Sequence, residues 1–262
     1  VTTALFIVAP PSNGDDKPVA PEPSHGKGGA AGTFANESMQ VGDRKRVYRL
    51  IVPEAVAESK EPAPLVFAFH GFLIDSKDLM PRYTKLPELA AKEGFILVFP
   101  DAINRAWPLV IDWAKADLAF FDALYEHVTS RYNVDLNRVY LTGMSNGAYF
   151  SHVVAQQRST KIAAIAPHSG GPGLFFFRGV KADYKYAVMA VHGLNDTIVQ
   201  PVESQRVRDM YKKEGHAVVL HEVEDLGHFW GHKIDVNEKM WTFFKEHPRR
   251  LKDEDVKAAD ER

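Results

Sequence analysis

The sequence predicts an α/β fold in which a mostly parallel central sheet carries helices on both faces. From Arg46 onward, segments typical of strands alternate with segments typical of helices. Several strand segments are continuous apolar runs, as expected for strands that are buried on both faces. No internal repeat or second domain is evident, so the 262 residues are expected to form one large domain with loose ends.

The expected strands follow from these runs. Residues 47–52 alternate at period two and are interpreted as an antiparallel edge strand. The runs interpreted as central strands are residues 64–69, 95–99 and 139–142. Further strands are expected at residues 162–166, 187–191 and 218–223.

The expected helices are marked by apolar periodicity and by stop signals. Residues 117–132 place Leu118, Phe121, Tyr125 and Val128 on one face. Other helices are expected at residues 86–93, from 148 onward, at 202–214 and at 237–246. We therefore expect a flexible leader at 1–36, a catalytic domain at 37–250 and a charged tail at 251–262.

Composition limits the functional classes. The formal net charge of -2 arises from 34 acidic and 32 basic residues, a balance that favours neither a nucleic-acid surface nor a membrane-binding patch. Cysteine is absent, which excludes disulfides, a thiolate nucleophile and cysteine-ligated metal.

The N-terminal region suggests export. Residues 3–9 are apolar but too few to span a bilayer, and residues 10–32 are rich in Pro, Gly, Ala and Ser. This pattern is interpreted as the remnant of an export signal, so a secreted or periplasmic protein is expected. A cytoplasmic location is left open, because exported and cytoplasmic proteins alike can lack cysteine.

Residues 143–147, Gly-Met-Ser-Asn-Gly, are the most informative segment. A β-branched and aromatic run precedes them and an amphipathic helix pattern follows. Strand, G-x-S-x-G and helix together are typical of a nucleophile elbow, which exposes a serine hydroxyl above the sheet edge. Ser145 is therefore the candidate nucleophile, and the backbone N–H of Asn146 is a candidate oxyanion donor.

A serine nucleophile needs a base, and the base needs an acid that orients it. In nucleophile-elbow sheets the acid and then the histidine follow the serine in chain order, on loops after later strands. Asp196 follows the strand at 187–191, and His228 follows the last strand. These are the candidate acid and base, with His232 as the rival base.

The second oxyanion donor is expected in the turn after an early central strand. His70, Gly71 and Phe72 occupy that place, directly after residues 64–69. Gly71 permits a tight turn, so the N–H of Phe72 is predicted to complete the oxyanion hole.

With these motifs in place, the chain resembles the polyhydroxybutyrate depolymerase and feruloyl esterase group of α/β-hydrolases over roughly residues 44–248. The segments that carry the resemblance are 70–72, 133–135, 138–147, 192–196, 227–230, 241–244 and 247–248. The resemblance implies ester hydrolysis through an acyl-enzyme by Ser145, His228 and Asp196, without a cofactor. The chain departs from the group in lacking cysteine and in reading Gly231-His232 where Pro-Gly is frequent.

The segment at 172–186 is short, so no substantial cap domain is expected and the cleft should be open. Phe72, Trp107, Phe229 and Trp230 are candidate aromatic walls, with plain core packing as the alternative for each. Aromatic walls favour feruloyl-type esters, with hydroxybutyrate polyesters second. The expected partner is thus a small or polymer-borne ester rather than nucleic acid or membrane, and the sequence indicates no oligomeric state.

Two other classes of function are alternatives. A metallohydrolase would use histidines and acids at positions 221, 222, 225, 228 and 232, but Gly227 and Gly231 argue against the helix that an H-E-x-x-H site needs. No metal is therefore predicted. A catalytically silent binding protein on the same fold is the second alternative. Among serine hydrolases, thioesterase and peptidase activities remain open.

Overall fold

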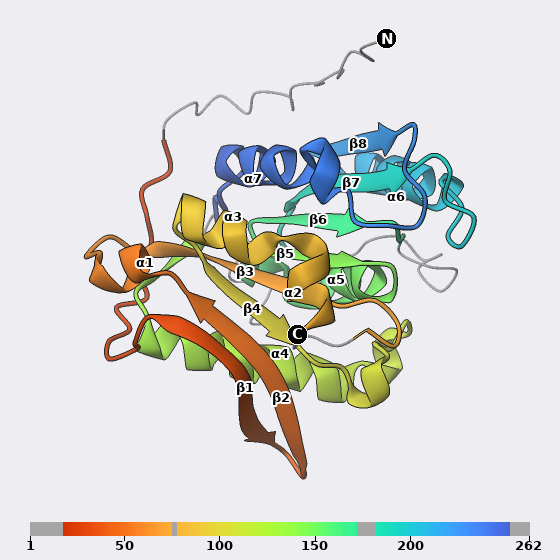
Figure 1. Cartoon of the computed structure of the whole chain (residues 1–262). Coiled ribbons are helices and arrows are strands. Elements are labelled where there is room, and N and C mark those ends of the chain that lie inside the picture. The colour runs from red at the N-terminus through yellow and green to blue at the C-terminus, as the bar shows by residue number, and fades with distance from the viewer. Residues whose placement is uncertain (1–17, 75–77, 172–181, 252–262) are drawn as a thin grey trace.

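A computed structural model describes residues 18–74, 78–171 and 182–251. Within these residues, eight strands form one sheet in the spatial order β1-β2-β4-β3-β5-β6-β7-β8 (Figure 1). Strands β1 and β2 are antiparallel to their neighbours, whereas the pairs from β4 to β8 are parallel. In chain order the strands are β1 (Gly32–Val41), β2 (Arg44–Val52), β3 (Ala63–Phe69), β4 (Ile96–Pro100), β5 (Val134–Met144), β6 (Ala164–His168), β7 (Ala187–Gly193) and β8 (Val218–Val223).

Helices cover both faces of the sheet, as the sequence predicts (Figure 1). On one face lie α2 (Leu79–Thr84), α3 (Leu86–Glu93) and α7 (Val236–Glu246), and on the other lie α4 (Lys115–Arg131), α5 (Asn146–Gln157) and α6 (Val202–Lys213). The short elements are α1 (Glu54–Glu58), η1 (Ile103–Arg105), η2 (Ile111–Trp113), η3 (Ser159–Lys161) and η5 (His232–Ile234). In the described part of the chain, no helix has the length and apolar character that crossing a membrane requires.

The central strands are buried on both faces, which explains their continuous apolar runs. In β3, Leu65 and Phe67 enter the core beneath α4 and α5, while Val66 and Ala68 enter the core beneath α3 and α7. Successive side chains of a strand point to opposite faces of the sheet. When both faces are covered, every position is apolar and the alternation of polar and apolar residues is lost.

The structure differs from the sequence-based boundaries at the N-terminal side. The predicted leader reached residue 36, but β1 already begins at Gly32, so β2 is not the edge strand. The preceding segment is bound as well, because the Ser24 hydroxyl contacts the carbonyl oxygens of Thr129 at 2.8 Å and Tyr132 at 2.9 Å. These contacts are polar and β1 is largely exposed. The sequence of this region therefore shows no apolar periodicity from which its structure could be predicted. Residues 1–17 of the predicted leader and 252–262 of the predicted tail lie outside the described residues.

Both described ends of the chain meet at the amino-terminal end of β5. Arg249 is 4% exposed, its backbone N–H donates to the Asn137 carbonyl oxygen at 2.8 Å, and its guanidinium pairs with Glu22 at 2.8 Å. The Asn137 amide also donates to the Ala20 carbonyl oxygen at 3.1 Å. This joins the segment before β1 to the segment after α7.

A buried ion pair fixes α4 to the antiparallel end of the sheet. The Arg46 guanidinium in β2 lies 2.6 Å from the Asp117 carboxylate, and their side chains are 4% and 6% exposed. Arg46 also donates to the carbonyl oxygens of Asp101 and Ala116 and stacks 4.1 Å from the centre of the Phe120 ring. Removing one partner of such a pair leaves an uncompensated buried charge.

We therefore expect Asp117→Asn to lower the free energy of unfolding by about 3 kcal/mol, measured by urea denaturation. Asp122 provides the matched control, since it pairs with Arg158 at 2.7 Å with both side chains about one-third exposed. Asp122→Asn should cost less than about 1 kcal/mol. Equal losses in the two variants would contradict the structural role of the Arg46–Asp117 pair.

Candidate active site

The candidate nucleophile lies in a strained turn between β5 and α5. Ser145 has φ 54° and ψ −119°, a backbone conformation that residues with a side chain rarely adopt. A Cβ atom on Gly143 would lie 2.5 Å from the Gly147 carbonyl oxygen, and one on Gly147 would collide with the Phe69 and His70 carbonyl oxygens. Only glycine fits at both positions, which is the steric requirement of a nucleophile elbow.

The predicted acid and base are joined by a hydrogen bond. His228 Nδ1 lies 2.7 Å from Asp196 Oδ2, and Asp196 Oδ1 accepts the backbone N–H groups of Ile198 and Val199 at 2.9 Å each. Burial by itself raises the pKa of Asp196, but the hydrogen bonds from His228, Val199 and Ile198 outweigh it, so the pKa lies below its ordinary value. The ionised carboxylate thus holds the His228 ring in one orientation.

The structure brings Asp196 and His228 together and places Ser145 at the same edge of the sheet. Ser145 follows β5 and Asp196 follows β7, with β6 between them, so the two strands lie about 10 Å apart. Among the described residues, no hydrogen bond joins the Ser145 hydroxyl to the His228 ring. Such contacts are often long in the absence of substrate and shorten in the reacting complex.

The turn after β3 contains one backbone N–H that lacks an acceptor among the described residues. Leu73 N–H donates to the Arg105 carbonyl oxygen at 3.0 Å, and Ile74 N–H donates to the Gly71 carbonyl oxygen at 3.2 Å. The N–H of Phe72 between them has no acceptor among the described residues, nor has that of Asn146 at the start of α5. Both are therefore available to an oxyanion, as the sequence predicts for this pair.

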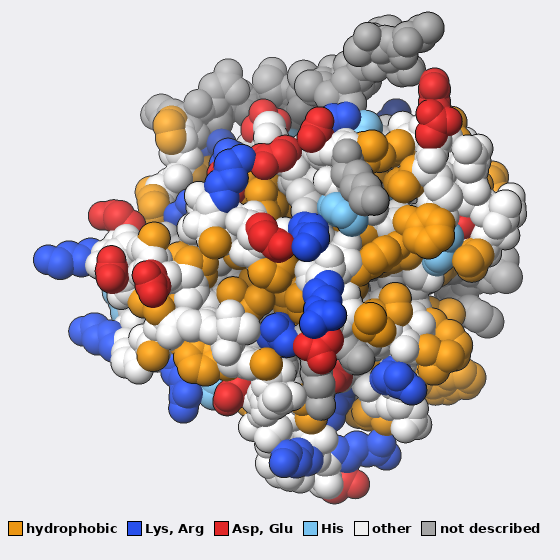
Figure 2. Space-filling model, in the orientation of Figure 1, with side chains coloured by type: hydrophobic (Ala, Val, Ile, Leu, Met, Phe, Trp, Pro, Cys, Tyr) orange, Lys and Arg blue, Asp and Glu red, His pale blue; other side chains and the backbone are white. Residues whose placement is uncertain are grey.

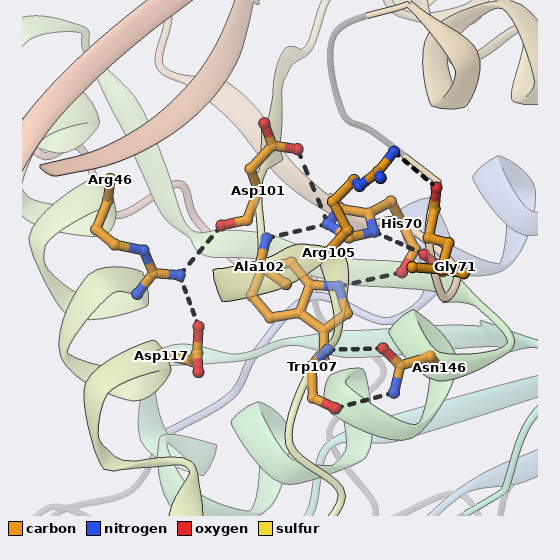
Figure 3. Close-up of polar contacts among 10 residues, drawn as sticks. Arg46, His70, Gly71, Asp101, Ala102, Arg105, Trp107, Asp117 and Asn146 are labelled. Atoms are coloured by element: carbon orange, nitrogen blue, oxygen red, sulfur yellow. Dashed lines mark hydrogen bonds and ion pairs between the residues drawn. The ribbon is translucent and has the colours of Figure 1, made fainter. Parts of the chain in front are cut away.

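A buried network connects this turn to the elbow (Figure 3). His70 Nδ1 lies 2.7 Å from the Gly71 carbonyl oxygen, and His70 Nε2 accepts the Ala102 N–H at 3.0 Å. The Trp107 indole N–H donates to the His70 carbonyl oxygen at 3.1 Å. The Asn146 side chain then accepts the Trp107 backbone N–H at 2.7 Å and donates to its carbonyl oxygen at 2.9 Å.

Sequence reasoning missed this network. From the sequence, His70 is expected only as part of the turn after residues 64–69, and Asn146 only as a backbone N–H donor. The asparagine beside the serine is the one local feature of the sequence that could have indicated this network. Its side-chain amide can accept a backbone N–H and donate to a backbone C=O at the same time. The partner of that amide, the backbone of Trp107 in the loop after β4, is visible only in three dimensions.

The prediction that Trp107 and Trp230 form walls of the cleft is wrong, since each is only 3% exposed. Trp107 stacks on Phe150 with the ring centres 4.5 Å apart. Trp230 packs edge-on against His168, and its indole N–H donates to Asn237 at 2.7 Å. Each indole N–H has a partner inside the protein, which allows the whole side chain to be buried.

The other two candidate wall residues are exposed, Phe72 at 60% and Phe229 at 61%. They belong to a larger set of exposed apolar side chains that follow β3, β4, β7 and β8, and therefore lie near the carboxyl ends of the strands. Figure 2 shows apolar side chains gathered on the side of the molecule where these strands end in Figure 1. The remaining members are Leu73, Leu109, Trp113, Leu194, Ile198, Val202 and Ile234.

The metal alternative gains no support from the described residues. Among them, no group of three or more His, Asp or Glu side chains converges in a way that could hold an ion. His228 lies in a loop and His232 begins η5, so they do not share a helix. The segment at 172–181, on which the prediction of a missing cap largely rests, lies outside the described residues.

Comparisons with known sequences agree with the geometry. The profile of the family described as esterase PHB depolymerase matches residues 46–182, and that of the prolyl oligopeptidase family matches residues 177–250. A bifunctional acetylxylan esterase/xylanase of Neocallimastix patriciarum is 31% identical over 158 residues, which is 59% of this chain and 22% of that protein. Feruloyl esterase D of Neurospora crassa is 27% identical over 203 residues, 73% of this chain and 67% of that one.

The chain thus spans about a fifth of the first relative and two thirds of the second. Solved structures match over more of the chain. A thermostable esterase superposes with a TM-score of 0.66 at 19% identity, over 83% of this chain and 63% of that one. S-formylglutathione hydrolase of Staphylococcus aureus has a TM-score of 0.66 at 13% identity, over 82% and 98%. These likenesses confirm the predicted α/β-hydrolase fold.

Proposed function

The chain belongs to the PHB depolymerase family of esterases, and from this premise we propose that it hydrolyses carboxylic esters through an acyl-enzyme on Ser145. The observation that carries the proposal is the 2.7 Å bond between His228 and the ionised Asp196, at the sheet edge where the strained Ser145 turn ends β5. Acyl transfer needs a nucleophilic hydroxyl, a base that takes its proton and an acid that orients the base.

The proposed reaction begins when His228 Nε2 removes the proton of the Ser145 hydroxyl as the oxygen attacks the ester carbonyl. The negative charge that develops on the carbonyl oxygen is stabilised by the N–H groups of Phe72 and Asn146. His228 then donates its proton to the departing alcohol, and the acyl-enzyme is hydrolysed by a water that His228 activates in the same way. Asp196 stays ionised throughout and stabilises the imidazolium.

The substrate class proposed first is feruloyl-type (hydroxycinnamoyl) esters, as small molecules or on a polymer. Feruloyl esterases C and D are among the relatives, and the exposed rings of Phe72 and Phe229 offer edge or offset contacts to a planar acyl group. The second candidate is hydroxybutyrate polyester or its oligomers, which the name of the matching family favours. An exported location remains a proposal from the composition of residues 3–32.

Ser145→Ala should lower kcat for p-nitrophenyl acetate by on the order of 10⁶, because no other group takes the place of a triad nucleophile. Ser151→Ala is the matched control on the same helix, where the hydroxyl donates only to the Gly147 carbonyl oxygen at 2.9 Å. Its activity should stay within about threefold of the parent, since one hydrogen bond inside a helix is lost. Activity of Ser145→Ala within tenfold of the parent would refute the proposal.

His228→Ala should be as damaging as Ser145→Ala, and the double variant should be no worse than either, because the two residues act as a unit. His232→Ala should be mild, since no hydrogen bond or ion pair joins His232 to an acidic side chain among the described residues. Steady-state kinetics of these four variants decide the assignment. If His232→Ala were the more damaging change, the base would be His232.

For the substrate class, kcat/KM for methyl ferulate should exceed that for p-nitrophenyl octanoate and for a hydroxybutyrate trimer. Phe229→Leu keeps an apolar side chain but removes the ring, so it should lower kcat/KM for methyl ferulate by about three- to tenfold and leave octanoate unchanged. A preference for octanoate of more than tenfold would contradict the aromatic contact. A preference for the trimer would favour the second candidate.

A further inference from the structure

A second imidazole contacts the acid of the proposed triad. His192, the next-to-last residue of strand β7, is fully buried, and its Nε2 lies 3.2 Å from Asp196 Oδ2. This is the same carboxylate oxygen that accepts the His228 Nδ1 bond at 2.7 Å. Two histidines therefore share one oxygen of Asp196, and only one of them has a role in the reaction proposed above.

The partners of His192 define which of its nitrogens carries the proton. Nε2 lies 2.9 Å from the Val199 carbonyl oxygen, which can only accept, so Nε2 is the donor. Nδ1 lies 2.5 Å from the Ser204 hydroxyl in the first turn of α6, and in this tautomer it accepts the hydroxyl proton. Ser204 is fully buried as well. The Nε2–H group thus donates to the Val199 carbonyl oxygen, and Asp196 Oδ2 lies 3.2 Å from the same nitrogen.

Three hydrogen bonds and the His192 contact hold the Asp196 carboxylate. Oδ1 accepts two backbone N–H groups, from Ile198 and Val199, while Oδ2 is hydrogen-bonded to His228 Nδ1 and lies 3.2 Å from His192 Nε2. Rotation of the carboxylate would break the hydrogen bonds to Ile198, Val199 and His228. Val199 closes a ring, because its N–H binds Oδ1 and its carbonyl oxygen binds His192.

We propose that His192, held in its tautomer by Ser204, is a positioning residue that fixes Asp196 Oδ2 toward His228. The proposal rests on the proposed function, since it concerns the acid of that triad. A catalytic carboxylate must be held within a fraction of an ångström of its productive place, and a residue in the second layer does this through its own locked hydrogen bonds.

His152 offers a matched control for burial and chemistry. It is also fully buried, and its Nδ1 lies 2.8 Å from the Tyr211 hydroxyl, which is again on α6. Its Nε2 has no partner among the described residues, and it makes no contact with Asp196. If the loss of activity came only from removing a buried imidazole, it would be the same for substitutions at His192 and at His152.

The test compares His192→Asn, His192→Gln and His152→Asn. Glutamine ends near the Nε2 position and keeps a donor toward Asp196, whereas asparagine ends near Nδ1 and reaches only Ser204. His192→Asn should lower kcat for p-nitrophenyl acetate by about 30-fold with KM within about twofold, because substrate is not touched. His192→Gln should stay within about fivefold of the parent, and His152→Asn within about twofold.

The double variant with Asp196→Asn gives the decisive comparison. If His192 acts through Asp196, adding His192→Asn to Asp196→Asn should cost less than about twofold further in kcat. Additive losses, equal losses for the Asn and Gln variants, or a change confined to KM would each overturn the proposal. Should His192→Asn fail to fold, Ser204→Ala replaces it, with an expected loss of about threefold, and parental activity would then overturn it.

A readout without turnover separates this proposal from the proposed function. The His228 Nδ1 proton shared with Asp196 should give a far-downfield resonance in the proton NMR spectrum of the parent. We expect that resonance to shift or broaden in His192→Asn and to be unchanged in His152→Asn. A parent that hydrolyses none of the esters would refute the proposed function, while an unchanged resonance in His192→Asn would refute the positioning role alone.

Discussion

The start of α5 packs directly on the carboxyl end of β3, and the layout of the site follows from that contact. At Gly147 the two backbones are so close that a Cβ atom would collide with the carbonyl oxygens of Phe69 and His70. The N–H of Asn146 is thereby brought beside the turn that carries the N–H of Phe72. The Asn146 side chain then ties both to the loop after β4 (Figure 3). A larger residue at position 147 would push the start of α5 away from the end of β3.

Two buried carboxylates show how environment decides what an acid can do. Burial dominates at Asp117 and raises its pKa, although Arg46 opposes the shift with its charge and its hydrogen bond. At Asp196 burial acts in the same direction, but His228 and two backbone N–H groups prevail and the pKa is lowered. The first pair joins α4 to the sheet, whereas the second carboxylate keeps its charge available to an imidazole.

Features that depend on local pattern could be predicted from the sequence. The apolar runs predict the buried strands. Gly143 and Gly147 predict a tight turn, because larger residues do not fit at these two positions. Chain order then predicts Asp196 and His228 as partners of Ser145. In the structure, a hydrogen bond joins Asp196 to His228. The burial of Trp107 and Trp230 could not be predicted, because an indole suits a core and a cleft equally until its N–H partner is known. Polar contacts such as those of Ser24 leave no periodicity at all.

The meeting of Glu22 and Arg249 at Asn137 has a practical consequence for handling the protein. Asn137 stands near the beginning of β5 and Ser145 at its end, so roughly 25 Å of strand separates the joined ends from the serine. A bead, a fusion partner or a carbohydrate-binding module attached beyond either of these residues would start from the edge opposite the catalytic one. Attachment close to Glu22 or Arg249 should therefore leave the edge that carries Ser145 free to meet a solid or polymeric substrate.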